Sequence, residues 1–403
     1  MCFNRVQHKK VVKLWVVLLL TAVSLLALIS PASWADEVLP PPEHIPADTR
    51  HSGTSDALPK TGGFSVGETR QFSAQIKPSN FAMIDARLIA QGGHTNIWLL
   101  DDEDFHKVTG TGHDENCTLK SFDAKMAREM ADTFDGIYVR MTDETTGFAR
   151  HEGVIIKLGL PDLDEIGDLG NDGKVNLLLY DILGDGSETG DSSWDGYFSN
   201  GDFFTALDGG INYLDMFHID VGKNHGFASL ADPNKKWDVY SYMAHEFQHL
   251  LCYMYFHAYV SANEYDEYIK YGWFDDSLAA AASVFYTIPD SEMIGDSVFG
   301  AAGNSYANSG YGDFVNHNGS GKNYGMGGML SRMLHKQTGG LYVHKVFEHF
   351  KKTYPPGDGY EANSAKFNGK DMDEVIGEVF NSVLGWNEST GKAAFARLYY
   401  LFM

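Results

Sequence analysis

Residues 242–251, Y-M-A-H-E-F-Q-H-L-L, decide most about the fold of this chain. On a helix, His245 and His249 lie on one face, so both rings can bind the same metal ion with Glu246 beside them. A glutamate in that place can take a proton from a metal-bound water. The spacing therefore predicts a hydrolytic zinc site with Glu246 as general base. Chance is the alternative, because the chain has 16 histidines among 403 residues.

The residues around this motif favour a buried helix. From Asp238 to about Val260 the chain has no Gly or Pro, and Asp238 or Ser241 could act as the N-cap. Apolar residues surround the motif on every side, which is typical of a helix through the core of a domain. Buried imidazole and carboxylate groups are costly unless they are hydrogen-bonded or bound to metal. The context therefore favours a metal site over structural histidines.

The N-terminus has the features of an export signal. Basic residues precede an apolar run from Leu14 to Ile29, and Ser33-Trp34-Ala35 offers a cleavage site. We therefore expect residues 1–35 to be a signal peptide and the protein to be secreted, at the cell surface or periplasmic. An uncleaved anchor is the alternative, because the apolar run approaches the length that spans a bilayer. After cleavage no stable membrane partner is expected.

The composition limits the partners of the chain. A formal net charge of -23 argues against nucleic acid and against an anionic membrane surface. Signal cleavage would leave Cys117 and Cys252, which are too few for a disulfide scaffold. We expect Cys252, on the motif helix, to be a buried apolar residue and not a ligand.

The remaining chain divides into three predicted parts. Residues 36–62 are rich in Pro, Ser, Thr and Gly, so we expect a linker or propeptide-like segment. Residues 63–150 contain short strand-like runs and a helix over 124–134, which predicts a small β-rich N-terminal unit. Residues 151–403 are then the catalytic domain. Its strand over 211–221 is predicted to be the edge strand above the metal, where an extended substrate could pair with it.

A second metal site is predicted upstream of this strand. Asp168, Asp172 and Gly173 are spaced as in a calcium loop, in which oxygen ligands alternate and glycine permits a sharp turn. The match is incomplete, because Gly170 and Leu179 occupy two ligand positions. A plain turn into the following strand is the alternative to calcium at Asp168 and Asp172.

A third zinc ligand has to come from downstream of the motif, because catalytic zinc usually has three protein ligands. Spacing alone does not choose among the candidate carboxylates, which are Glu264, Glu267, Asp275 and Asp276. The small residues from Ala279 to Ser283 would let a second helix approach the motif helix closely. This favours Asp276 as the ligand, with Asp275 as an N-cap and Glu267 as the alternative ligand.

Six stretches of the chain resemble the hyicolysin-like family of bacterial secreted neutral metalloproteases. They are A-H-E-F-Q-H-L at 244–250, D-G-K-V-N-L-L-L-Y-D at 172–181, G-Y-F-S-N-G-D-F-F at 196–204, N-Y-L-D-M-F-H-I-D at 212–220, W-F-D-D-S-L-A at 273–279 and N-Y-G-M-G-G-M-L-S-R-M-L at 323–334. Only the first stretch is a strong match by itself, but the order of all six along the chain also agrees with the family. The resemblance implies a zincin, an α+β fold with a mixed sheet, the motif helix, a mainly helical C-terminal part and one catalytic zinc.

The chain departs from the family pattern at one position. That pattern resembles W-L-N-E-x-L-S with glutamate as the third ligand, whereas this chain has Asp276 there. The aspartate side chain is one methylene shorter than the glutamate of the family pattern. Either the second helix lies closer, Glu267 replaces Asp276, or metal affinity and activity are weakened.

Together these observations predict an exported zinc endopeptidase that acts on proteins or peptides. His245, His249 and Asp276 would hold the zinc. Glu246 would take the proton of the attacking water and pass it to the leaving amine. Tyr324 could donate a hydrogen bond to the oxyanion, with a packing role as the alternative. Two other functions stay open. The protein could trim short peptides, or it could be a catalytically weakened metallopeptidase-like protein that serves in surface binding or adhesion.

Overall fold

The computed structural model describes a discontinuous set of residues. They are 63–77, 80–100, 124–142, 149–151, 154–156, 172–182, 196–199, 202, 212, 214–221, 236–257, 274–283, 330–331, 333–335, 337–339, 341–354 and 370–402. Several predictions fall outside them, namely those on residues 1–35 and 36–62, Cys117, Asp168, Glu264, Glu267 and Tyr324. No helix within the described ranges has the length and hydrophobicity needed to span a bilayer.

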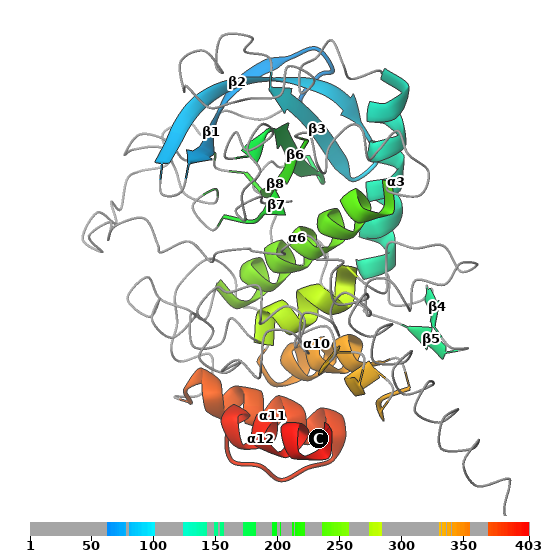
Figure 1. Cartoon of the computed structure of the whole chain (residues 1–403), viewed down its shortest axis with the longest axis vertical. Coiled ribbons are helices and arrows are strands. Elements are labelled where there is room, and N and C mark those ends of the chain that lie inside the picture. The colour runs from blue at the N-terminus through cyan, green and yellow to red at the C-terminus, as the bar shows by residue number, and fades with distance from the viewer. Residues whose placement is uncertain are drawn as a thin grey trace, which may run out of the picture. The chain divides into compact units, whose positions relative to one another are not determined.

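The described chain is a mixed α/β structure with a six-stranded mixed sheet (Figure 1). The strand order is β1-β2-β3-β6-β8-β7, in which β3, β6 and β8 are parallel and the other pairs are antiparallel. The strands are β1 Thr69–Lys77, β2 Asn80–Gln91, β3 Thr95–Leu100, β6 Val175–Tyr180, β7 Gly196–Tyr197 and β8 Met216–Asp220. Two short strands, β4 Ala149–His151 and β5 Val154–Ile156, form a separate pair. Strands from both sides of residue 150 therefore contribute to the main sheet.

The strand predicted over 211–221 is not the edge of the sheet. The structure has β8 at Met216–Asp220, between β6 and β7, so β7 is the terminal strand among the described residues. The prediction was wrong because β7 has only two residues, which are too few to show an alternating pattern.

Five labelled helices accompany the sheet. They are α3 Ala124–Thr142, α6 Lys236–His257, α10 Tyr342–Thr353, α11 Met372–Leu384 and α12 Gly391–Phe402. A further helix covers residues 274–283. The motif lies within α6, which begins at Lys236, where the ammonium group is 2.8 Å from Glu129 of α3. Asp238 and Ser241 lie inside this helix, so the prediction that one of them is its N-cap is wrong.

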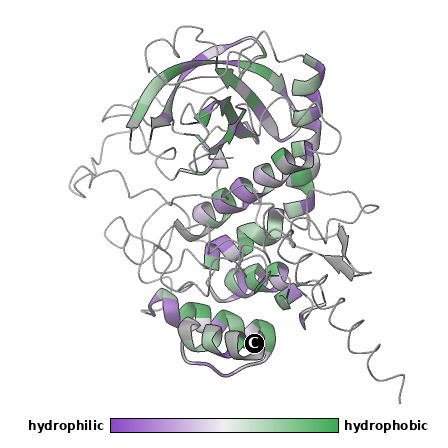
Figure 2. Ribbon diagram, viewed as in Figure 1, coloured by the Kyte–Doolittle hydropathy of each residue, from purple (hydrophilic) through white to green (hydrophobic). Residues whose placement is uncertain are grey.

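The two faces of the sheet bury separate cores. On β8, Phe217 and Ile219 pack towards α3 and α6, whereas Met216 packs on the opposite face. The helix-side core includes Phe247 of α6, whose ring meets that of Phe134 edge to face at 5.2 Å. Figure 2 shows hydrophilic residues in the middle of α6, although this helix is buried in the core. That hydrophilic part holds the motif.

The second core lies inside a curl of the sheet, where β1 and β2 arch over β6, β8 and β7 (Figure 1). Its centre is Trp98 of β3, whose ring lies 5.0 Å from that of Phe72 on β1. The register of β1 on β2 is irregular between Gln75 and Lys77. There the Gln75 backbone N–H donates to the hydroxyl of Tyr197 on β7 at 3.2 Å. A side chain therefore connects the two strands that stand at opposite ends of the sheet order.

Candidate metal site

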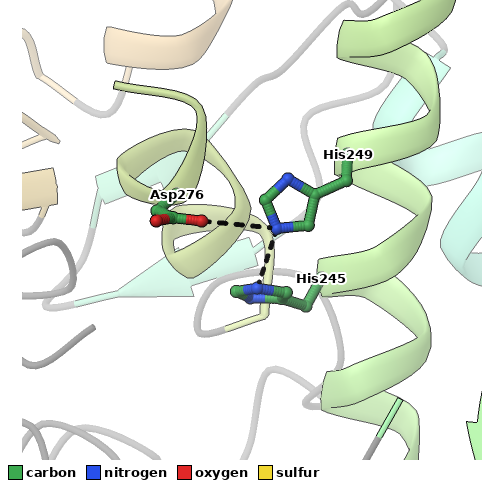
Figure 3. A group of neighbouring side chains, drawn as sticks. All are labelled: His245, His249 and Asp276. Carbon is green, nitrogen blue, oxygen red and sulfur yellow. Dashed lines mark hydrogen bonds and ion pairs between the residues drawn. The ribbon is translucent and has the colours of Figure 1, made fainter. Parts of the chain in front are cut away.

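His245, His249 and Asp276 form a cluster between α6 and the helix over residues 274–283 (Figure 3). One nitrogen or carboxylate oxygen from each residue lies within 4.8 Å of the other two. The Nε2 atoms of the two histidines are 3.1 Å apart, and Oδ1 of Asp276 lies 3.6 Å from Nε2 of His249. Among the described residues this is the one group of three such side chains within reach of a single ion. Two imidazole nitrogens and a carboxylate oxygen fit the donor set of a catalytic zinc site.

Small side chains bring the two helices together at this cluster. Residues 279–282 are all alanines and all buried. The His245 ring makes a hydrogen bond to the backbone of Ala279, so this ring packs directly against the second helix. A larger residue at position 279 would push Asp276 away from the histidines. The structure thus places Asp276 with His245 and His249, while Glu267, the alternative ligand, lies outside the described residues.

Asp275 has a role that the sequence did not reveal. It lies inside the helix, and its Oδ2 atom is 2.7 Å from Nδ1 of His249, so the prediction that it is an N-cap is wrong. A carboxylate on the outer nitrogen of a ligand histidine fixes the orientation of the ring and raises its basicity. The one signal in the sequence was the pair of adjacent acidic residues, which does not tell ligand from partner.

The same carboxylate also contacts the thiol of Cys252. This cysteine is buried, as predicted. It is also free, and its thiol hydrogen-bonds to Asp275. The side-chain amide of Gln248 donates to Sγ of Cys252 at 3.0 Å. Burial raises the pKa of the Cys252 thiol, and the Asp275 charge raises it further, so the sulfur stays protonated. Cys252 therefore helps to hold Asp275 in place.

The two histidines differ in their electrostatic surroundings. Burial lowers the pKa of His245 well below its ordinary value, and the neighbouring His249 lowers it further. Burial acts in the same direction on His249, but the charge and hydrogen bond of Asp275 outweigh it and raise the pKa of His249 to about 10. Without metal, His245 is therefore neutral, and a proton is held on His249.

Glu246 lies against the backbone of the terminal strand β7. Glu246 is buried, with an exposed fraction of 5%. A β-carbon added at Gly196 would lie 3.3 Å from Cγ of Glu246 and 2.9 Å from the carbonyl oxygen of His218. The second distance is shorter than real β-carbon contacts allow, so a side chain here would force the backbone to move. Glycine at position 196 therefore allows the strand to pass directly beside the predicted general base.

Asp172 and Gly173, the described residues of the predicted calcium loop, lie in a turn. Oδ1 of Asp172 accepts the Lys174 backbone N–H at 3.1 Å, and Oδ2 accepts the Asn96 side-chain amide at 3.0 Å. Gly173 has a φ of +71°, which favours glycine. The geometry agrees with the alternative of a plain turn, and nothing in the described residues supports calcium.

The chain is distantly similar to a known metalloprotease. No family model matches the chain. The neutral metalloprotease ShpI of Staphylococcus hyicus is 26% identical to it over 252 residues, a match that covers 61% of this chain. The chain spans about half the length of this curated relative, since the match covers 46% of it. The mixed sheet is compatible with a metallopeptidase fold, and the similarity indicates a distant relationship between this chain and a metalloprotease.

Proposed function

We propose that the protein is an exported zinc endopeptidase whose site consists of His245, His249, Asp276 and Glu246. The observation that carries this proposal is the cluster of two imidazoles and a carboxylate with the motif glutamate beside it. The distant similarity to a neutral metalloprotease supports the same chemistry. Its substrates would be proteins or peptides.

Each residue has a distinct task in the proposed reaction. When bound, zinc would act as a Lewis acid and lower the pKa of a coordinated water. His245 and His249 would bind it through Nε2, and Asp276 through a carboxylate oxygen. Asp275 accepts the Nδ1 proton of His249, which leaves the Nε2 lone pair available for the metal. Glu246 would receive the proton of the attacking water and deliver it to the leaving nitrogen.

The terminal position of β7 supports binding of an extended substrate. Its partner β8 occupies one side, and β7 is the last strand of the described sheet. A terminal strand can bind a peptide by strand addition, through main-chain hydrogen bonds that do not depend on sequence. Since Gly196 places this strand beside Glu246, a peptide paired with β7 would pass the proposed base.

The rest of the sequence prediction belongs to the same proposal. Residues 1–35 would direct export, and residues 36–62 would form a linker or propeptide-like segment. Residues 63–150 and 151–403 would be the β-rich unit and the catalytic domain, and Tyr324 would stabilise the oxyanion. Release of residues 1–35 during secretion, followed by N-terminal sequencing, tests the first of these assignments.

The decisive experiment combines metal analysis with a substitution of the base. We expect the purified protein to contain one zinc per chain and to cleave casein in a chelator-sensitive manner. Glu246→Gln should keep the zinc but lower cleavage by about a thousandfold or more, because proton transfer alone contributes about 10²–10⁴-fold. The matched control is Glu388→Gln, which breaks an ion pair between the α11–α12 connection and Arg397 of α12 and should leave cleavage unchanged.

Two results would contradict the proposal. A folded protein that takes up no zinc has no catalytic metal site of this kind. A protein that binds zinc but cleaves neither casein nor a library of short peptides would instead support the alternative of a surface binding or adhesion protein. The aspartate at position 276, in place of the glutamate of the family pattern, is the feature that favours this alternative.

A further inference from the structure

The two residues of β7 face opposite sides of the sheet. Gly196 pairs with Ile219 and faces α6, where an added β-carbon would meet Glu246. Tyr197 pairs with His218 and faces the core inside the curl of the sheet. A strand of two residues makes few ladder hydrogen bonds, so its own pairing holds it weakly. The contacts of Tyr197 therefore matter for where the strand lies.

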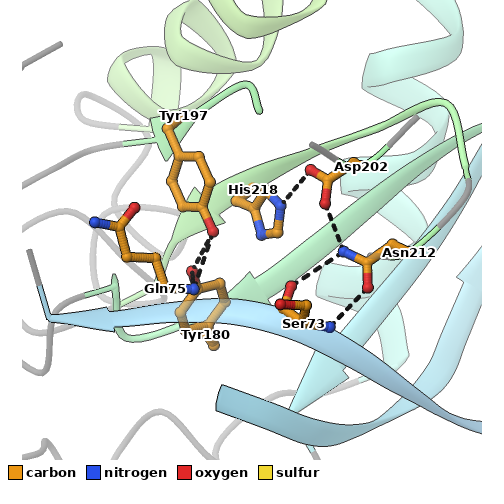
Figure 4. A network of polar contacts seen from close by, with 7 residues as sticks. All are labelled: Ser73, Gln75, Tyr180, Tyr197, Asp202, Asn212 and His218. Carbon is orange, nitrogen blue, oxygen red and sulfur yellow. Dashed lines mark hydrogen bonds and ion pairs between the residues drawn. The ribbon is translucent and has the colours of Figure 1, made fainter. Parts of the chain in front are cut away.

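Three other strands hold the Tyr197 side chain (Figure 4). Its hydroxyl lies 2.8 Å from that of Tyr180 on β6 and accepts the Gln75 N–H of β1 at 3.2 Å. Its ring stacks on that of His218 on β8, with centroids 4.1 Å apart and an interplanar angle of 7°. Burial raises the pKa of both Tyr180 and Tyr197, so both hydroxyls stay neutral. The side chain is thus fixed at its ring and at its hydroxyl.

The stacking partner of Tyr197 is itself held in place. Nε2 of His218 lies 2.9 Å from Oδ2 of Asp202, and Oδ1 of Asp202 accepts the Asn212 side-chain amide at 2.6 Å. Asn212 in turn exchanges two hydrogen bonds with the Ser73 backbone of β1, at 2.6 and 3.0 Å. All four residues are buried. These hydrogen bonds restrain the His218 ring on its Nε2 side.

We infer that Tyr197 is a positioning residue that holds the β7 backbone against Glu246. The inference rests on the proposed peptidase function and names the element that sets the place of its general base. If the Tyr197 contacts are weakened, β7 can move away from Glu246, and the side chain of Glu246 loses its neighbour on that side. A displacement of about 1 Å at a reacting group can cost about a hundredfold in rate.

A kinetic comparison of two tyrosine substitutions tests this role. Tyr197→Phe keeps the stacked ring but removes the hydroxyl, and we expect kcat to fall about tenfold with KM changed less than about threefold. Zinc content should stay at the wild-type level. The matched control is Tyr354→Phe, which removes a buried hydroxyl that donates to Glu378 at 2.6 Å in the C-terminal helices. It should lower thermal stability but leave kcat within about twofold.

A double-mutant cycle tests the same contact without any assay of activity. Gly196→Ala should lower Tm by about 2–4 °C, because the new methyl group crowds Glu246 and the His218 carbonyl. Glu246→Ala removes the Cγ atom that the new methyl group would meet, so in this background we expect the loss from Gly196→Ala to be about half as large. Circular dichroism melts of the zinc-loaded wild type, the two single variants and the double variant measure the coupling between positions 196 and 246.

The outcomes separate the inference from the proposed function. Equal kcat values for Tyr197→Phe and Tyr354→Phe would overturn the inference, since a purely structural tyrosine behaves in that way. An equal Tm loss from Gly196→Ala in both backgrounds would also overturn it. A folded wild-type protein without cleavage would refute the proposed function, and the melting cycle would then decide alone whether β7 is held against Glu246.

Discussion

Oδ2 of Asp275 lies 2.7 Å from Nδ1 of His249, whereas Nε2 of the same ring faces His245 and Asp276. One carboxylate therefore holds the ring from behind, and the opposite nitrogen points at the candidate metal position. Two consecutive aspartates on one helix thus have different partners. Asp275 contacts the outer side of a ligand, whereas Asp276 lies where a ligand would.

Substitution of Asp275 should weaken zinc binding without removing a ligand. We expect Asp275→Asn to raise the Kd for zinc about 10–100-fold, because the His249 ring loses its charged partner. Competition with a chromophoric chelator measures this Kd. Asp132→Asn, which breaks an exposed pair with Arg128 on α3, serves as a control of equal charge change and should leave the Kd unchanged. An unchanged Kd in Asp275→Asn would show that the contact does not support the ligand.

Substitution of Asp276 should cost more zinc affinity than substitution of Asp275. Asp276→Asn removes a charged ligand, so we expect the protein to retain less than one zinc per chain after dialysis. Glu267→Gln should keep a full zinc content. Atomic absorption on the dialysed proteins gives both values. The opposite result, with zinc lost in Glu267→Gln and kept in Asp276→Asn, would assign Glu267 as the third ligand.

Zinc uptake by the metal-free protein should release a proton. The pKa of His249 is raised to about 10, so this ring is protonated at pH 7 and must lose its proton before Nε2 can bind metal. His245 is already neutral and contributes none. We expect about one proton released per zinc near pH 7, falling towards zero as the pH rises through about 10. Calorimetric titrations in buffers of different ionisation enthalpy measure this number, and no release at pH 7 would contradict the prediction.

The C-terminal helices should lose stability in acid through Glu378. Burial alone would raise the pKa of this carboxyl group, but hydrogen bonds from Lys370 and Tyr354 outweigh burial and lower it. A carboxyl with a lowered folded pKa stabilises the fold above its unfolded pKa, which is about 4.3 for glutamate. This contribution is lost as the pH falls through the folded pKa.

The measurement is Tm as a function of pH between 3 and 7. Glu378→Gln should have a lower Tm than wild type at pH 7, and the difference should shrink in acid, where the wild-type carboxyl also becomes neutral. Glu348→Gln, on the exposed side of α10, is the control and should follow the wild-type curve. A difference between wild type and Glu378→Gln that stays constant with pH would contradict the assignment.

Local patterns in the sequence indicated much of the motif region. An uninterrupted run without Gly or Pro indicated α6, and alternation indicated β8, although β8 is shorter than predicted. His245, Glu246 and His249 could be selected because helical spacing is a local property. The alanine run on the second helix also pointed to Asp276, since small side chains permit close approach.

The rest of the site depends on contacts between distant parts of the chain. Asp275 and His249 are 26 residues apart, and no local pattern distinguishes a partner of a ligand from an N-cap. The position of β8 inside the sheet depends on its pairing with β7, a strand too short to have a period. The start of α6 at Lys236 coincides with an ion pair to α3, which the sequence of α6 alone does not contain.

The bond between the Gln75 N–H and the Tyr197 hydroxyl joins residues that are 122 positions apart in the chain. Shortened versions of the protein that start after β1 would therefore lose one of the contacts that hold the strand beside Glu246, even though every proposed metal ligand would remain. A single-residue deletion in β1 before Gln75 would turn its side chains to the other face of the strand and withdraw this donor. The tolerance of the proposed site to insertions and deletions is thus set partly by the length of β1.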